Sequence, residues 1–135
     1  MSNYEISLET PEYPYTLRSV DFTVDTSPDM NTVFWVQNKR GVLQGALLYV
    51  DSDDVPIRLL ADGVDLAPIA SSINDLMLSG FDVPHPVYPY APASGVWCYT
   101  PLAGHRLSRF YQDLKIEVGA PAHVVGRVIW TDNEM

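Results

Sequence analysis

The chain is poor in cysteine and has no long apolar run. Cys98 is the only cysteine among 135 residues, so no disulfide can form within the chain, and we expect folding in a reducing cytosol. Proline and glycine interrupt the uncharged stretches, which predicts no insertion into a membrane. The first ten residues include two glutamates and no apolar core, so we do not expect a signal peptide.

Basic residues are also scarce. The chain has 8 lysines and arginines against 17 aspartates and glutamates, which gives a formal net charge of -9. The basic residues are scattered and form no stripe. Because a nucleic-acid-binding protein needs clustered positive charge to displace counterions from phosphates, the sequence predicts no direct binding of nucleic acid. The same shortage disfavours binding to an anionic lipid surface.

Residues with metal-ligand chemistry are few and badly spaced. His85, His105 and His123 lie far apart, and the chain has no H-x-H pair of the kind found in small β-barrel metalloenzymes. The acidic segment Asp51–Asp54 lacks the other ligand positions of an EF-hand, so a solvated hairpin turn is the simpler interpretation. We therefore expect neither a metal ion nor another cofactor.

Signatures of catalysis are missing as well. Ser71–Ser72 lacks the glycines of a nucleophile elbow, and the glycines elsewhere match neither a dinucleotide-binding loop nor a P-loop. Cys98 has the apolar neighbours Trp97 and Tyr99, which favour a buried, unreactive thiol. The sequence therefore predicts that the protein is not an enzyme. An enzyme with a non-obvious site stays open as a third alternative.

Short runs of β-branched and aromatic residues, by contrast, are abundant. Thr32–Gln37, Val42–Val50 and Ile57–Leu60 are separated by turn-forming residues, which predicts a β-meander. The pair Asp62-Gly63 favours a tight hairpin that joins the third run to a strand beginning near Val64. Further strands are expected at Arg18–Asp25, Val96–Tyr99, Asp113–Val118 and Val124–Trp130.

One segment departs from the strand pattern. Apolar residues from Leu66 to Met77 recur at helical spacing, which predicts a short helix at 68–78 with Gly80 as its C-cap. Alternation along the strands predicts the residues of the core. These are Val20, Phe22, Val33, Trp35, Leu48, Val50, Ile116, Val118, Val128 and Trp130.

Two further segments carry more aromatic surface than their own length can bury. Residues 1–17 combine apolar alternation with proline-stiffened tyrosines, which predicts an N-terminal extended arm before a single domain at 18–135. Residues 81–100 predict a long proline-rich loop. Each segment either packs on its own domain or docks on a neighbouring subunit. Under the second hypothesis the candidate interface residues are Tyr4, Ile6, Tyr13, Tyr15, Tyr88 and Tyr90.

A resemblance to a known group of proteins rests on the segment Val42–Asp53. A Gln-Gly pair there leads into apolar residues, a tyrosine and Val-Asp, followed by a polar turn, another strand and a glycine-containing hairpin. This pattern resembles small virion proteins of bacteriophages, nearest the single jelly-roll penton and minor capsid proteins of membrane-containing phages. The resemblance covers Val33–Gly63 and, more loosely, Val124–Trp130, while the helical spacing at Ile69–Leu78 departs from it.

The resemblance implies both a fold and a function. The expected fold is mainly β, an antiparallel, jelly-roll-like β-sandwich with one short helix near 68–78. The implied function is that of a virion structural protein, a capsid vertex, minor capsid or decoration subunit. Such a protein is made in the host cytoplasm and assembles as a homo-oligomer with other virion proteins.

The alternative is a β-sandwich that binds a ligand. A tail or receptor-binding component of this kind would hold a carbohydrate against exposed aromatic rings. The residues that would supply these stacking faces are Trp35, Trp97, Tyr88 and Tyr90.

Overall fold

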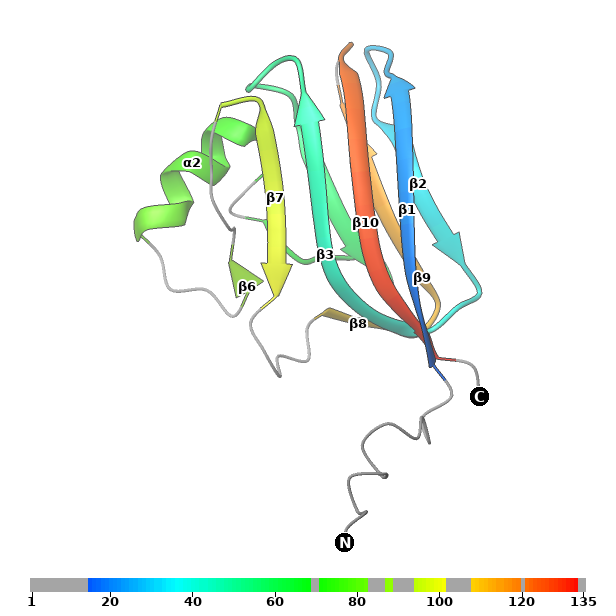
Figure 1. Cartoon of the computed structure of the whole chain (residues 1–135). Helices are drawn as coiled ribbons and strands as arrows, with labels where there is room; N and C mark the ends of the chain where they lie inside the picture. The colour runs from blue at the N-terminus through cyan, green and yellow to red at the C-terminus, as the bar shows by residue number, and fades with distance from the viewer. Residues whose placement is uncertain are drawn as a thin grey trace, which may run out of the picture.

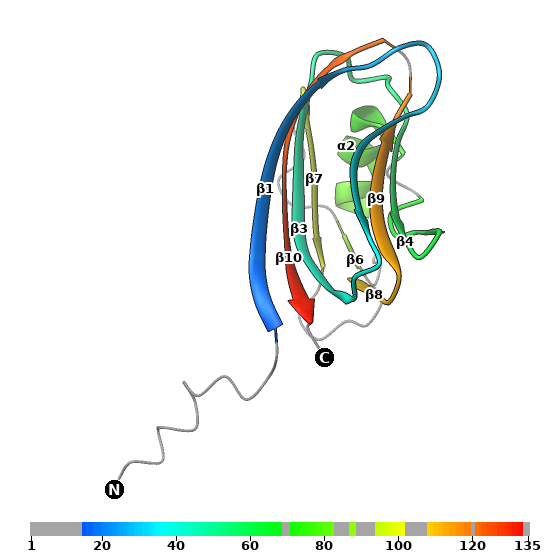
Figure 2. The same ribbon diagram turned by 90° about the vertical axis from the view of Figure 1, so that its right-hand side faces the viewer.

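The predicted apolar runs form strands in two antiparallel layers (Figures 1 and 2). The computed structural model describes residues 15–68, 71–82, 87–88, 94–101, 108–119 and 121–133. The strands of sheet A are β1 (Tyr15–Asp25), β3 (Gly41–Val50), β6 (Val87–Tyr88), β7 (Val96–Pro101), β8 (Arg109–Phe110) and β10 (His123–Asn133). The strands of sheet B are β2 (Asn31–Gln37), β4 (Ile57–Ala61), β5 (Val64–Asp65) and β9 (Asp113–Val118).

The order of strands in each sheet has a simple rule. Sheet A runs β1-β10-β3-β7-β6, with β8 paired to β3, and sheet B runs β2-β9-β4-β5. The main pairs are therefore β1 with β10, β2 with β9, β3 with β7 and β4 with β5, all antiparallel. A chain that pairs its ends first and its middle last, and distributes the pairs alternately over two sheets, has the jelly-roll arrangement. The predicted fold class is confirmed.

The predicted β-meander is wrong, although its three strands are present. β2 and β4 lie in sheet B on either side of β9, whereas β3 lies in sheet A. The connections of three residues (38–40) and six residues (51–56) are long enough to cross the distance of about 10 Å between packed sheets. Turn-forming residues at these positions therefore mark crossings between the sheets and not hairpins within one.

The acidic loop between β3 and β4 is such a crossing, and it is more than a solvated turn. Asp51 accepts a hydrogen bond from the backbone N–H of His123 at 3.1 Å. Asp53 accepts one from the N–H of Gly95 at 2.8 Å, and its carbonyl accepts one from the N–H of Asn74 at 3.0 Å. The loop therefore holds the beginnings of β10, β7 and the helix in place.

The predicted hairpin at Asp62-Gly63 is confirmed. Both residues have positive φ, 53° and 84°, as a two-residue turn between twisted strands requires, and Ala61 pairs with Val64 across it. The turn also connects to another part of the chain, because the Asp62 carboxylate accepts hydrogen bonds from three successive backbone N–H groups. The donors are Tyr111, Gln112 and Asp113, at 2.8, 2.7 and 3.0 Å.

The described helix, α2 (Ile73–Asp82), begins later than the predicted 68–78 and continues past Gly80, which is not its C-cap. Ser72 explains the start. Its Oγ accepts a hydrogen bond from the backbone N–H of Asp75 at 3.1 Å, as an N-cap side chain does. α2 lies beside β7 at one side of the sandwich (Figure 1). Among the residues that the structure describes, no helix is long and apolar enough to cross a membrane.

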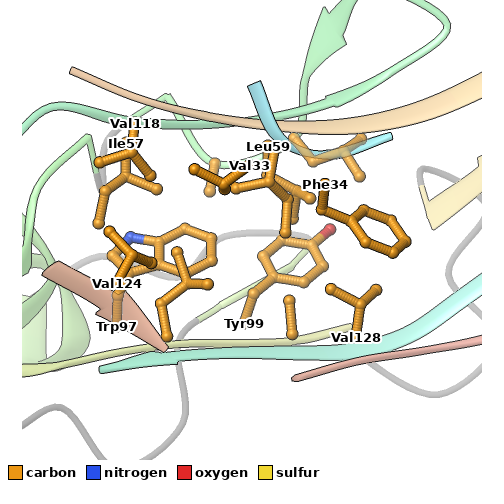
Figure 3. Packing of buried hydrophobic residues seen from close by; sticks show 14 of the residues in the cluster. Val33, Phe34, Ile57, Leu59, Trp97, Tyr99, Val118, Val124 and Val128 are labelled. Carbon is orange, nitrogen blue, oxygen red and sulfur yellow. The ribbon is translucent and has the colours of Figure 1, made fainter. Parts of the chain in front are cut away.

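An apolar layer fills the space between the sheets (Figure 3). Trp97 and Tyr99 extend from β7 toward sheet B, with their rings stacked and their centroids 6.3 Å apart. Trp130 of β10 meets the ring of Phe34 of β2 edge-on, at 5.5 Å between centroids. Each of these four aromatic side chains is less than a tenth exposed. The two sheets are therefore joined by apolar contact along most of their length.

Two of the ten predicted core residues are wrong. Trp35 is 48% exposed and Val20 is 37% exposed, whereas Phe22 is partly buried and the other seven are buried. A bulge in the pairing of β2 with β9 turns both Val33 and Phe34 inward, which leaves Trp35 on the outer face. Val20 lies on β1, the edge strand of sheet A, where only one neighbouring strand can cover it.

The predicted boundary of the arm also shifts. β1 begins at Tyr15, whose backbone pairs with Asn133, so residues 15–17 belong to the sandwich. The proline-rich segment contains the short strand β6, in which Tyr88 pairs with Thr100 of β7. The other residues named in these predictions lie outside the described part of the chain. They are Tyr4, Ile6, Tyr13, Tyr90, His85 and His105.

The inner and outer faces of the sheets predict effects of different size for two tryptophan substitutions. Trp130→Ala removes a ring that is 6% exposed and packed on Phe34, and we expect a loss of about 3–5 kcal/mol in the free energy of unfolding. Trp35→Ala removes a half-exposed ring that donates a hydrogen bond to Asp113, so we expect a loss of about 1 kcal/mol. Urea unfolding measures both losses, and equal losses would contradict the placement of Trp130 in the core and Trp35 on the outer face.

Asp62 predicts a dependence of stability on pH. Partial burial opposes its ionisation, but the three N–H donors outweigh this and hold the pKa of the carboxyl below its ordinary value of 3.8. A lowered pKa means that the ionised group stabilises the fold above about pH 4, and that this contribution is lost as the pH falls through the lowered pKa. Asp62→Asn, which also tolerates positive φ, should cost about 1 kcal/mol at neutral pH.

The measurement is urea unfolding of wild type and Asp62→Asn at neutral pH and near pH 3. The difference between them should narrow at the lower pH, because the pH is then below the ordinary pKa of 3.8 and the carboxyl is largely protonated in the unfolded chain. Asp29→Asn, which changes an exposed loop aspartate, is the matched control and should have little effect at either pH. A deficit of Asp62→Asn that stays constant down to pH 3 would exclude the charge as its cause.

Candidate functional site: the outer face of sheet A

The outer faces of the two sheets differ in character. On sheet B, Arg58 and Lys115 form ion pairs with Glu117 at 3.6 and 3.5 Å. The Lys115 ammonium also lies 4.8 Å from the centre of the Trp35 ring, and the Trp35 indole N–H donates to Asp113 at 3.0 Å. A charged network of this kind is usual for the solvated face of an antiparallel sheet.

The outer face of sheet A is mainly apolar. Three rows of neighbouring residues cross β10, β3 and β7 in the strand register: Val125-Tyr49-Val96, Arg127-Leu47-Cys98 and Ile129-Gly45. Tyr49 is 52% exposed and Val125 is 38% exposed, while Leu47 and Ile129 are half-buried between their neighbours. Figure 1 looks onto this face, and in Figure 2 no described helix or strand lies outside it. We call these eight residues the sheet A face.

One ion pair stands within this apolar surface. Arg127 donates from Nε and Nη2 to the two carboxylate oxygens of Asp21, at 2.6 and 3.0 Å. The hydrogen bond from Arg127 lowers the pKa of Asp21, and the same bond raises the pKa of Arg127. Both groups therefore stay ionised at neutral pH, and together they add no net charge to the face.

The sheet A face is hollowed in two places. The Gly45 hollow has a volume of about 310 Å³ and is lined by Gly45, Ala46, Leu47, Val96, Cys98, Tyr99, Thr100, Arg127 and Ile129. The Val125 hollow is of equal volume and is lined by Asp21, Phe22, Thr23, Leu47, Tyr49, Val125, Gly126 and Arg127. Leu47 and Arg127 line both hollows and separate them. The Gly45 hollow exists because Gly45 contributes no side chain to its row.

The aromatic residues predicted as stacking faces do not come together. Trp97 lies in the core and is 1% exposed. Trp35 is on the outer face of sheet B, with Lys115 over its ring. For Tyr88 the structure describes the backbone in β6, and Tyr90 lies outside the described residues. The predicted set therefore forms no common aromatic surface in the described part of the chain.

The residues considered as metal ligands in the sequence do not come together either. His123 is at the start of β10, where its Nδ1 lies 2.6 Å from a carboxylate oxygen of Asp25. Within the described ranges, no group of three histidine, cysteine, aspartate or glutamate side chains is placed to hold a metal ion.

Cys98, predicted to be buried, is half-buried on the sheet A face, because Trp97 and Tyr99 take the inward positions of β7.

Sequence reasoning missed the sheet A face, although the sequence contains a sign of it. Successive residues of a strand point to opposite faces, so consecutive apolar residues make both faces of a strand apolar. Such pairs occur at Leu47–Leu48 and Tyr49–Val50 in β3, and at Val124–Val125 and Val128–Ile129 in β10. An antiparallel strand with one solvated face would alternate instead.

Two adjacent residues of β3 test whether these outward side chains belong to the core. Leu48→Ala removes a side chain that is 0% exposed, and we expect a loss of about 2–5 kcal/mol in the free energy of unfolding. Tyr49→Thr keeps a residue that favours strands and changes only the outer face, so we expect a change of about 0.5 kcal/mol or less at low protein concentration. A large loss for Tyr49→Thr would show that the sheet A face is needed for folding.

Comparison with known proteins adds no family to this geometry. No protein-family model matches the chain, and no curated protein is similar to it in sequence.

Proposed function

We propose that the protein is a virion structural subunit that acts by binding other proteins through the sheet A face. The observation that carries this proposal is the contrast between the two outer faces. The outer face of sheet B carries the ion pairs of Arg58 and Lys115 with Glu117. The outer face of sheet A instead exposes Tyr49, Val125 and their apolar neighbours to solvent. Large exposed apolar patches on soluble proteins mark sites of interaction.

The size of the face suits a protein partner. The eight residues span five positions along three neighbouring strands, which is roughly 250 Å² of sheet. A stable protein–protein interface buries about 800 Å² on each side, so a single partner placed on this face would cover all of it and extend onto the surface around it. Tyr49, which lines the Val125 hollow and is half-exposed, also resembles the aromatic anchors that dominate the energetics of such interfaces.

The jelly-roll arrangement supports the same proposal. Folds of this kind occur in viral capsid proteins and also in lectins and cupins, so the fold by itself does not choose among these functions. The carbohydrate-binding alternative needs exposed aromatic rings. Trp97 is in the core, and Trp35 is on the other sheet with Lys115 over its ring, so the two tryptophans form no common stacking surface. The described residues therefore favour assembly over sugar binding.

The proposal predicts that the chain is a component of viral particles and that the sheet A face attaches it to them. Val125→Lys places a charge on the sheet A face beside Tyr49, and we expect its incorporation into particles to fall at least tenfold. Thr32→Lys places the same charge on the outer face of sheet B and is the matched control, with incorporation unchanged. Mass spectrometry of purified particles measures the amount of each variant.

Other outcomes would count against the proposal. A chain that is missing from purified particles, or that enters them equally well with Val125→Lys, does not act through this face as a virion subunit. A chain that is monomeric in solution, binds no particle protein and retains an oligosaccharide on a column would support the ligand-binding alternative. Light scattering coupled to size-exclusion chromatography gives the mass in solution.

A further inference from the structure

We infer that the partner on the sheet A face is a second copy of this chain, in a two-fold dimer in which Tyr49 of each copy fills the Gly45 hollow of the other. This inference rests on the proposed function, because it names the occupant of the same face. It is carried by the shape of the face and by the spacing along β3, and the charge of the face does not oppose it.

The shape of the face is complementary to itself. Tyr49 projects from β3 and is 52% exposed, while four residues earlier Gly45 leaves a hollow of about 310 Å³. The walls of the hollow are side chains such as Val96, Cys98 and Ile129, which suit an aromatic ring. In a two-fold contact residue i touches j and j touches i, so one protrusion and one hollow on the same face produce two identical insertions.

The spacing along β3 fits such an axis. Tyr49, Leu47 and Gly45 stand at alternate positions, and each step along the strand is about 7 Å. Leu47 is halfway between the protrusion and the hollow and lines both hollows of the face. A two-fold axis that passes across β3 at Leu47 brings Tyr49 of each copy over Gly45 of the other. Leu47 of the two copies then meets at the centre of the contact.

Charge at the contact itself does not oppose a second copy. The chain carries a net charge of -9, and many of its acids lie in loops, such as Asp51, Asp53 and Asp62. The sheet A face itself is close to neutral, since Asp21 and Arg127 neutralise each other. Two copies can therefore meet there without bringing net charge together.

The dimer is tested with full-length variants that alter the protrusion or the hollow. Tyr49→Thr removes the protrusion, and Gly45→Val fills the hollow. The Gly45→Val substitution is compatible with the fold because a Cβ at Gly45 meets only the carbonyl oxygen of Tyr99, at an ordinary 3.6 Å. We expect a dimer for wild type, and a dimer dissociation constant at least tenfold higher for each variant, measured by sedimentation. Thr32→Lys, on the outer face of sheet B, should leave the constant unchanged.

A cross-link identifies the contact directly. Tyr49→Cys should be joined to Cys98 of the second copy by a bifunctional maleimide, since Cys98 lines the hollow that receives residue 49 and facing sheets lie about 10 Å apart, which is too far for a direct disulfide. The cross-linked dimer should contain a peptide joining residues 49 and 98, and it should be lost when Cys98→Ser is added. A dimer linked only through residue 49 of both copies would overturn the proposed register.

The outcomes separate this inference from the proposed function. A wild-type chain that stays monomeric, or a dimer unaffected by both Tyr49→Thr and Gly45→Val, overturns the two-fold contact. If that monomer still enters particles, and Val125→Lys lowers its incorporation, the proposed function stands and the face has a different occupant. If instead serine at Tyr4, Ile6 and Tyr13 uncovers the face of a monomer to an apolar dye, the chain's own N-terminal segment is the occupant, and the dimer is wrong.

Discussion

The apolar layer between the two sheets is the interaction on which the rest of the structure depends. Each connection that crosses from one sheet to the other is fixed because the strands that it joins bury apolar side chains in that layer. Trp97, Tyr99 and Trp130 of sheet A reach across to Phe34 and its neighbours of sheet B. Because this layer stabilises the fold, stability does not depend on the outer faces, and one of them can be apolar without being part of the core.

The sequence was sufficient for the positions of the strands and insufficient for their partners. Alternation and turn chemistry locate β2, β3 and β4, but connections of three and six residues fit a hairpin and a crossing equally well. Trp35 was misplaced by a bulge, which shifts the alternation by one residue and leaves no mark in the composition. The start of α2 depends on a single hydroxyl, that of Ser72, among several residues able to cap a helix.

The candidate site was harder to predict than the fold for a physical reason. An apolar side chain has the same chemistry whether it faces the core or another protein, and only the arrangement of strands separates the two. Leu48 and Leu47 are adjacent and identical in type, yet one is in the core and the other lines a hollow on the surface. The doubled apolar residues of β3 and β10 contain that information, but it is readable only once both strands are known to be antiparallel.

The long pairing of β1 with β10 has a mechanical consequence. The pairing runs from Tyr15 and Asn133 to Asp25 and His123, and both ends of the described chain leave the sandwich at the same end (Figure 1). Hydrogen bonds of an antiparallel ladder lie perpendicular to the strands, so a force that separates these two ends acts along the bonds and loads them one at a time. The hydrogen bonds between the two strands would break one after another, at low force. A sandwich of this design yields when it is pulled by these two ends.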